Sequence, residues 1–191
     1  MTSTPSVAAP PSSRAIKHLR RAVAVTAGAL AVALAAQFAI PLPGTPGPMT
    51  LQPLAVLIVG GLLGPGYGAL SLMVYLEMGV VGLPVFTPGG APGLARLLGP
   101  TGGYLLAYPL AAALTGWLAR RARGWAGIIV APLAGLVVVY LGGLAQLAVL
   151  SGSVTAAAAA GTLPFLAGDL LKVGVAAAVL HRLLPSMRAP R

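Results

Sequence analysis

The sequence contains no cysteine and very little charge, since only 7% of its 191 residues are Asp, Glu, Lys or Arg. A soluble domain carries roughly 25% charged residues, and so few charges cannot cover the surface of a water-soluble enzyme or binding module. The absence of cysteine excludes disulfides, thiolate metal sites and a cysteine nucleophile. Because 58% of the residues are hydrophobic, we expect an all-α integral membrane protein that crosses the bilayer several times.

Negative charge is the scarcest, with two acidic residues against twelve basic ones. The basic residues are not interleaved with aromatic residues along one face, as they are in nucleic-acid-binding proteins. They cluster beside apolar stretches, at residues 14–21, 120–123 and 182–191. Membrane proteins mark cytoplasmic loops in this way. The net charge of +10 therefore indicates topology, and we expect no nucleic-acid partner.

Apolar stretches of a length suited to crossing a bilayer cover residues 22–40, 51–64, 66–83, 103–119, 127–150 and 164–184. The second is short, and a re-entrant second stretch would leave five crossings. Six crossings place ten of the twelve basic residues on one side. Five crossings would move two basic clusters outside, against the positive-inside rule. We therefore predict six transmembrane helices within a membrane domain of residues 22–184, with cytoplasmic N and C termini.

Both ends of the chain lie outside this predicted domain. Residues 1–21 are expected to form a basic, largely disordered cytoplasmic segment, and residues 185–191 a short cytoplasmic tail. A cleaved signal peptide is the alternative interpretation of the first apolar stretch. That stretch is longer than the roughly 7–15 apolar residues of a signal peptide, and its removal would leave an odd number of crossings.

Two connecting segments on the predicted outer side, residues 41–50 and 84–102, are dense in Pro and Gly and carry no charge except Arg96. Such segments do not favour regular helix, yet they are too apolar to extend into water. Irregular backbone at membrane depth packs on protein or lines a cavity. We expect structured outer loops that cap a pocket. Ordinary connecting loops are the alternative, which leaves the near-absence of Lys, Glu, Asp and Ser unexplained.

Both acidic residues, Glu77 and Asp169, lie inside predicted spans, where ionisable groups are costly and point to function. Lys172 follows Asp169 by three residues, so both side chains share one helix face. Their depth suits the floor of a pocket that opens outward. The pair either neutralises itself in the membrane or binds the two ends of an amphipathic ligand. Glu77 has no charged neighbour at helical spacing, and its roles, including proton coupling, stay open.

Motifs for catalysis are missing. The sequence contains no H-E-x-x-H, no G-x-S-x-G and no G-x-x-x-x-G-K-[ST], the motifs of zinc proteases, serine hydrolases and P-loop ATPases. We therefore expect a protein that is not an enzyme, with no catalytic residues, no metal site and no cofactor, and that does not itself hydrolyse ATP.

Small residues recur every four positions in the first apolar stretch, at Ala27, Ala31 and Ala35. Such a stripe lets another helix approach closely. It indicates either docking onto another membrane subunit or packing within this chain.

Four segments of the sequence match a known family: GLLGPGYGALSLMVYLEMGVVGLPVF at residues 61–86, GGAPGLARLLGPTGGYL at 89–105, MTLQP at 49–53 and PFLAGDLLKVGVAAAVL at 164–180. They resemble the BioY family, the biotin-binding S components of energy-coupling factor (ECF) transporters. The resemblance extends from about residue 41 to residue 184. The combination of LPVF, GPTGGY and GDLLK is far more specific than a lone glycine motif.

The resemblance implies a six-helix receptor in the bacterial or archaeal plasma membrane, with both ends inside and a biotin site under the first and third loops. It implies that Asp169 contacts the ureido ring of biotin and Lys172 the valerate carboxylate. Weaker candidates for polar contacts with the ligand are Thr50, Gln52, Gly89 and Gly90. Two further candidates, Thr101 and Tyr104, either order the capping loop or touch the ligand. The implied partners are a transmembrane T component, which the alanine stripe would contact, and cytoplasmic ATP-binding subunits that energise uptake.

Two positions of this sequence depart from the family pattern. Leu105 stands where some relatives have an Arg that assists the carboxylate, and Glu77 replaces an apolar residue. Arg96 is the basic residue on the outer side that could compensate. The alternative function is a stand-alone, proton-coupled secondary transporter of biotin or another small vitamin, although the sequence shows no inverted repeat of the kind such transporters carry.

Overall fold

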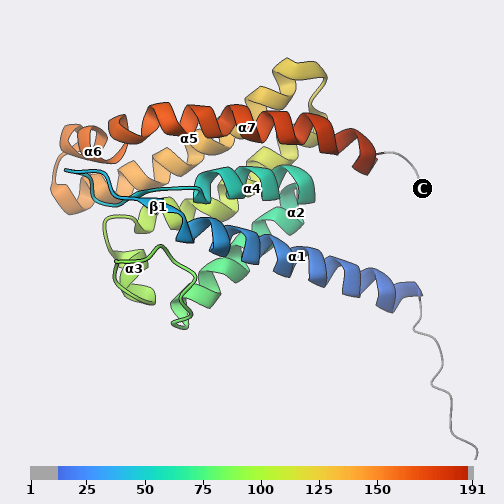
Figure 1. Cartoon of the computed structure of the whole chain (residues 1–191), viewed down its shortest axis with the longest axis horizontal. Coiled ribbons are helices and arrows are strands. Elements are labelled where there is room, and N and C mark those ends of the chain that lie inside the picture. Colours follow the sequence, from blue (N-terminus) through green and yellow to red (C-terminus); the bar gives the residue numbers. More distant parts are fainter. Residues whose placement is uncertain (1–12, 189–191) are drawn as a thin grey trace, which may run out of the picture.

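A computed structural model describes residues 13–188 of the chain, which form a bundle of long helices (Figure 1). The elements are α1 (Ser13–Gln37), β1 (Ala39–Ile40), β2 (Met49–Thr50), α2 (Gln52–Val80), α3 (Leu94–Leu98), α4 (Gly102–Arg121), α5 (Gly124–Ser151), α6 (Val154–Gly161) and α7 (Leu163–Arg188). Four helices, α1, α2, α5 and α7, are long and apolar enough to cross a membrane. This architecture agrees with the predicted all-α membrane protein.

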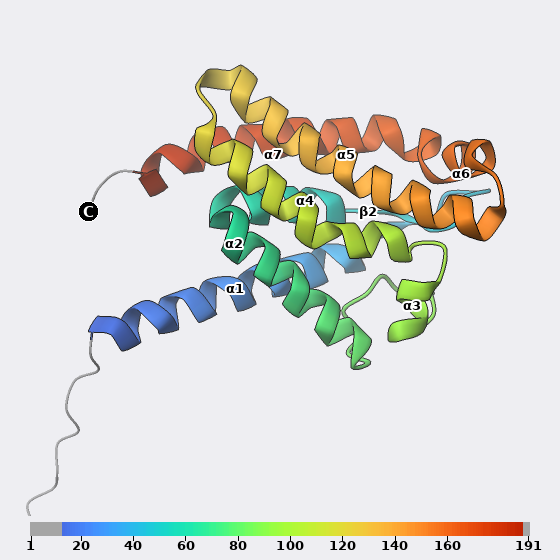
Figure 2. The same ribbon diagram turned by 180° about the vertical axis from the view of Figure 1, so that it is seen from behind.

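Helix α2 is a hairpin of two arms, residues 52–63 and 65–80. Gly64 lies between them with φ 79° and ψ −178°, and Pro65 follows. A Cβ placed on Gly68 would lie 2.9 Å from the Cα of Gly60, although eight residues of straight helix span about 12 Å. Gln52 and Tyr75, near opposite ends of α2, are hydrogen-bonded at 2.6 Å. The separate stretches predicted at residues 51–64 and 66–83 correspond to these two arms (Figure 2).

The bundle has two distinct ends. The loop end holds β1, β2, α3 and α6, and the terminal end holds the start of α1, the turn of α2 and the last turns of α7 (Figures 1 and 2). At the loop end, β1 pairs antiparallel with β2, with Ala39 opposite Thr50. Basic side chains are exposed at the terminal end, namely Arg14, Lys17, Arg20, Arg21, Arg120, Arg121, Arg123 and Arg182.

Glycines allow the backbones of α2 and α4 to approach each other closely. A Cβ on Gly60 would lie 2.5 Å from the carbonyl oxygen of Ala112, and one on Gly116 would lie 2.4 Å from the carbonyl oxygen of Gly60. Small residues serve this purpose at helix interfaces in membranes, where close backbone approach supplies the van der Waals contact. The fully buried side chains beside this crossing include those of Leu57 and Leu72.

Three expectations differ from the structure. α1 begins at Ser13 rather than at residue 22. Residues 13–21, which were expected to be largely disordered, are therefore helical. This stretch is rich in Ala, Leu, Arg and Lys and contains no Pro or Gly, a composition that favours helix. α3 interrupts the segment expected to be irregular, since LARLL has no helix breaker between Gly93 and Gly99. α6 was not predicted. The expected disorder of residues 1–12 lies outside the described residues, as does the tail beyond residue 188.

The turn at Gly64 yields a stability prediction. Its φ and ψ are open essentially to glycine alone, and another residue costs roughly 1–3 kcal/mol there. A Cβ would also meet the guanidinium of Arg120, which donates to the Leu63 carbonyl at 3.1 Å. We expect Gly64→Ala to lower the midpoint of thermal unfolding in detergent. Gly66→Ala, at an exposed helical position with open space around it, is the matched control. Equal midpoints for the two variants would contradict this role of Gly64.

Candidate ligand-binding site

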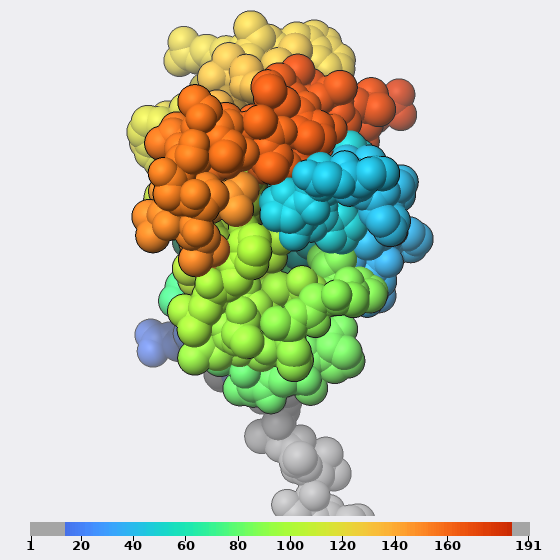
Figure 3. Space-filling view, turned by 90° about the vertical axis from the view of Figure 1, so that its left-hand side faces the viewer, coloured from blue at the N-terminus to red at the C-terminus, as the bar shows by residue number. Residues whose placement is uncertain are grey.

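A partly open cavity of about 100 Å³ lies at the loop end of the bundle. The segment before α2, the segment around α3 and the α6–α7 region meet there (light blue, green and orange in Figure 3). The lining residues are Pro46, Gly47, Pro48, Thr50, Gln52, Pro53, Thr87, Arg96, Thr101, Tyr104, Leu105, Tyr108, Val139, Tyr140, Gly161, Phe165, Asp169 and Lys172. Both predicted capping loops contribute to this wall.

A buried ion pair on α7 forms one polar corner of the cavity. Lys172 Nζ donates to Asp169 Oδ1 at 2.7 Å, and the two residues are 8% and 6% exposed. Tyr140 on α5 donates its hydroxyl to Asp169 Oδ2 at 2.7 Å. A buried carboxylate is tolerated only with such partners. Each carboxylate oxygen has a second lone pair, so Asp169 retains acceptor capacity for a ligand.

Gln52 organises the opposite wall. Its Oε1 accepts hydrogen bonds from Thr87 at 2.8 Å and from Thr50 at 3.2 Å. Its Nε2 donates to the Tyr75 hydroxyl at 2.6 Å, and the Gln52 side chain is buried. This network ties the two arms of α2 to both capping loops. The loops are therefore part of the folded cavity rather than loose connections.

Arg96 on α3 brings a second cation to the cavity. Its guanidinium donates to the Thr87 carbonyl oxygen and packs against Gly90, where a Cβ would overlap it. Burial lowers the pKa of Arg96 below its ordinary value, but a guanidinium stays protonated in proteins. Two cations and one carboxylate therefore surround the space, an arrangement that favours a ligand carrying negative charge.

Aromatic and aliphatic side chains complete the cavity. The Tyr104 ring lies against Gly143, where a Cβ would overlap it, and its hydroxyl donates to the Gly161 carbonyl at 2.7 Å. Tyr108 and Leu105 are buried in the same wall, and Phe165 on α7 lines the cavity as well. A flat apolar ring can pack against these surfaces while polar groups reach the ion pair.

The structure brings together six of the eight predicted ligand contacts, namely Thr50, Gln52, Thr101, Tyr104, Asp169 and Lys172. Gly89 and Gly90 are exposed and do not line the cavity. Gly89 adopts φ 78°, so its turn conformation accounts for the glycine. Sequence reasoning missed Tyr140 and Thr87. Tyr140 carries a hydroxyl within the apolar stretch of residues 127–150, which was the available signal.

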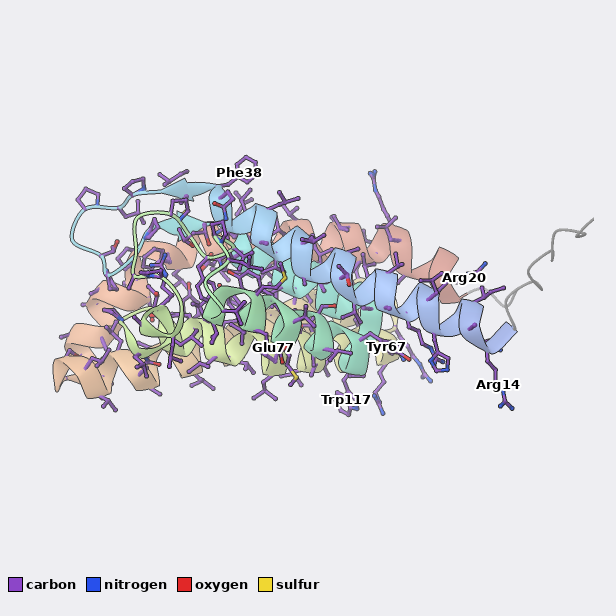
Figure 4. The ribbon with its side chains drawn as sticks, turned by 90° about the horizontal axis from the view of Figure 1, so that it is seen from below. Arg14, Arg20, Phe38, Tyr67, Glu77 and Trp117 are labelled. Atoms are coloured by element: carbon purple, nitrogen blue, oxygen red, sulfur yellow. The ribbon has the colours of Figure 1, made fainter. Side chains whose placement is uncertain are left out.

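Residues singled out elsewhere lie away from the cavity. Glu77 is exposed on the second arm of α2 (Figure 4). Ala27 and Ala31 are exposed and Ala35 is half-buried, so the alanine stripe faces largely outward. Ala27 and Ala31 therefore contribute little to packing within this chain, whereas Ala35 is partly covered.

Comparison with known proteins agrees with this architecture. The sequence matches the model of the BioY family over residues 6–189. It is 38% identical over 141 residues to a probable biotin transporter BioY of Pyrococcus horikoshii, covering 72% of this chain and 81% of that protein. It is 35% identical over 146 residues to the biotin transporter BioY of Thermotoga maritima, covering 75% and 85% of the two chains.

A solved structure gives the same result. The crystal structure of the S-component for biotin from an ECF-type ABC transporter superposes with a TM-score of 0.80 at 27% identity, covering 92% of this chain and 95% of that one. These relatives are named as transporters and not as enzymes, in agreement with the expectation that this chain is not an enzyme. The matched length, the identities and the shared fold together establish that the chain belongs to the BioY family.

Proposed function

We propose that this protein is a biotin receptor of the plasma membrane that mediates biotin uptake as the S component of an ECF transporter. The observation that carries the proposal is the cavity at the loop end with the buried Asp169–Lys172 pair in its wall. The names of its family members supply the choice of ligand.

Biotin fits this cavity chemically. Its ureido group offers two N–H donors, its thioether ring is apolar and its valerate tail ends in a carboxylate. Asp169 has lone pairs free to accept from the ureido N–H groups, and Lys172 pairs with the carboxylate as a compact cation. Tyr108 and Phe165 pack against the ring. Thr50, Gln52, Thr101 and Tyr104 supply further polar contacts or hold the cap in place, and Arg96 adds positive charge.

The proposed topology has six transmembrane segments: α1, the two arms of α2, α4, α5 and α7. The terminal end faces the cytoplasm, because its exposed Arg and Lys residues follow the positive-inside rule. The cavity then opens toward the outside. The outward alanine stripe at Ala27, Ala31 and Ala35 contacts a transmembrane T component, which cytoplasmic ATP-binding subunits energise.

Equilibrium binding of labelled biotin to the purified chain in detergent tests this function directly. We expect a dissociation constant in the nanomolar range, about −12 kcal/mol. Absence of binding by protein that remains monodisperse and helical would reject biotin as the ligand. Uptake into proteoliposomes that is equally fast with and without the T component and ATPases would reject the energised mechanism.

The role of Lys172 gives a further prediction. We expect Lys172→Met to weaken biotin binding by roughly 30-fold or more, because the loss of a buried charge partner costs about 2–5 kcal/mol. Biotin methyl ester lacks the carboxylate charge, so its affinity should fall far less in the same variant. Competition against labelled biotin measures both ligands. Equal losses for the acid and the ester would show that Lys172 does not recognise the carboxylate.

A further inference from the structure

A second hollow opens beside the cavity, on the flank between the β1–β2 pair and α7. It is lined by residues 37–40, residues 49–51 and Lys172. Its rim is apolar and open, since Phe38 is 65% exposed and Ile40 is 64% exposed. Figure 4 shows Phe38 on the outside of the bundle, where α1 ends.

The hollow and the cavity share a wall. Thr50 and Lys172 line both spaces. The seam between β2 and α7 is made by side chains, because the Sδ and Cε atoms of Met49 lie 2.9 Å from where a Cβ on Gly168 would be. The Met49 side chain is unbranched and flexible. A layer only one side chain thick therefore separates the two spaces, and part of that layer can swing aside.

The shared wall lies beside the expected position of the biotin carboxylate. In the proposed binding mode, on which this inference rests, Lys172 pairs with the biotin carboxylate. A group attached to that carboxylate would leave the cavity at the shared wall and enter the hollow. An amide there still offers a carbonyl oxygen to the Lys172 ammonium. Lys172 also keeps Asp169 as its counter-ion at 2.7 Å, so the lost ligand charge does not leave it unpaired.

We propose that the hollow is a second subsite, which holds an apolar chain attached to the carboxylate of biotin. The protein thus binds alkyl amides of biotin as well as the free acid. Phe38, Ile40, Met49 and Leu51 provide the apolar contact. Each methylene removed from water between these side chains strengthens binding by roughly two- to fourfold.

A chain-length series tests the subsite on the unaltered full chain. Biotin N-ethyl, N-butyl and N-hexyl amides compete with labelled biotin for the purified protein in detergent. We expect affinity to rise from ethyl to butyl by about fourfold or more, and to level off once the hollow is filled. A flat or falling series beside tight biotin binding would overturn the subsite and leave the proposed function intact. Failure of biotin itself to bind would overturn both.

A variant that fills the hollow separates specific contact from partition of the longer amides into detergent. Ala39 lines the hollow but not the cavity, so Ala39→Trp should weaken the hexyl amide by about tenfold or more. Biotin binding should stay within about threefold, as for a substitution away from its contacts. Leu171→Trp, at a position on α7 that is 70% exposed and lines neither space, is the matched control. Equal effects of Ala39→Trp on both ligands would overturn the proposal.

Discussion

Replacing Asp169 with asparagine is expected to weaken biotin binding by roughly two orders of magnitude. The carboxylate accepts hydrogen bonds from both Lys172 and Tyr140 at 2.7 Å, and in the proposed mode it also accepts from the ureido group. An asparagine offers one oxygen in place of two and leaves the buried ammonium without a counter-ion. Titration of labelled biotin into purified Asp169→Asn measures the loss.

The double variant Asp169→Asn/Lys172→Met distinguishes a binding defect from a folding defect. It removes both buried charges, and such pairs can be replaced by neutral groups with little loss of stability. We expect its thermal midpoint to exceed that of Asp169→Asn alone while biotin binding stays weak. Tight binding by either variant would reduce the ion pair to a structural feature of α7.

The second large effect is expected at the crossing of α2 and α4. Gly60→Leu would place side-chain atoms where the backbone of Ala112 already lies, because even a Cβ comes within 2.6 Å of the Ala112 Cα. Backbone cannot rotate away as a side chain can, so the helices must separate. Overpacking typically costs about 1–3 kcal/mol, and more where nothing can yield. We expect folded Gly60→Leu to be recovered poorly, as measured by size-exclusion chromatography after extraction in detergent.

Gly174→Leu is the control for this change. Gly174 is exposed on α7, and no atom lies within 4 Å of the Cβ it would gain. It tests whether a longer apolar side chain in a membrane helix is harmful in itself. Comparable recovery of the two variants would show that the α2–α4 contact tolerates a wider spacing than the structure has.

Much of the fold was predictable because a bilayer restricts the possibilities. Apolar run length and the placement of Arg and Lys locate the long helices, and Gly64 with Pro65 divides residues 51–83 into two arms. α3 and α6 were not predicted, since short helices at the end of a bundle have no apolar period against an apolar background. The run of five alanines in α6 has high helix propensity and was a usable signal.

The site was predictable where its chemistry is local in sequence. Asp169 and Lys172 meet because they are three residues apart on one helix. The contacts of Gln52 with Tyr75 and Thr87 join residues 23 and 35 positions away, and Tyr140 reaches Asp169 across 29 positions. Such pairs depend on how helices and loops approach one another, which composition and periodicity do not encode.

The two tryptophans lie away from the cavity, and this placement separates their fluorescence from the ligand site. Both tryptophans of the chain lie toward the terminal end, where Trp117 stacks with Arg121 and Trp125 with His181. The tyrosines that line the cavity are Tyr104, Tyr108 and Tyr140. Thirteen residues of helix, about 20 Å, separate Tyr104 from Trp117. Tryptophan emission therefore reports on the terminal end of the bundle and not on the ligand site.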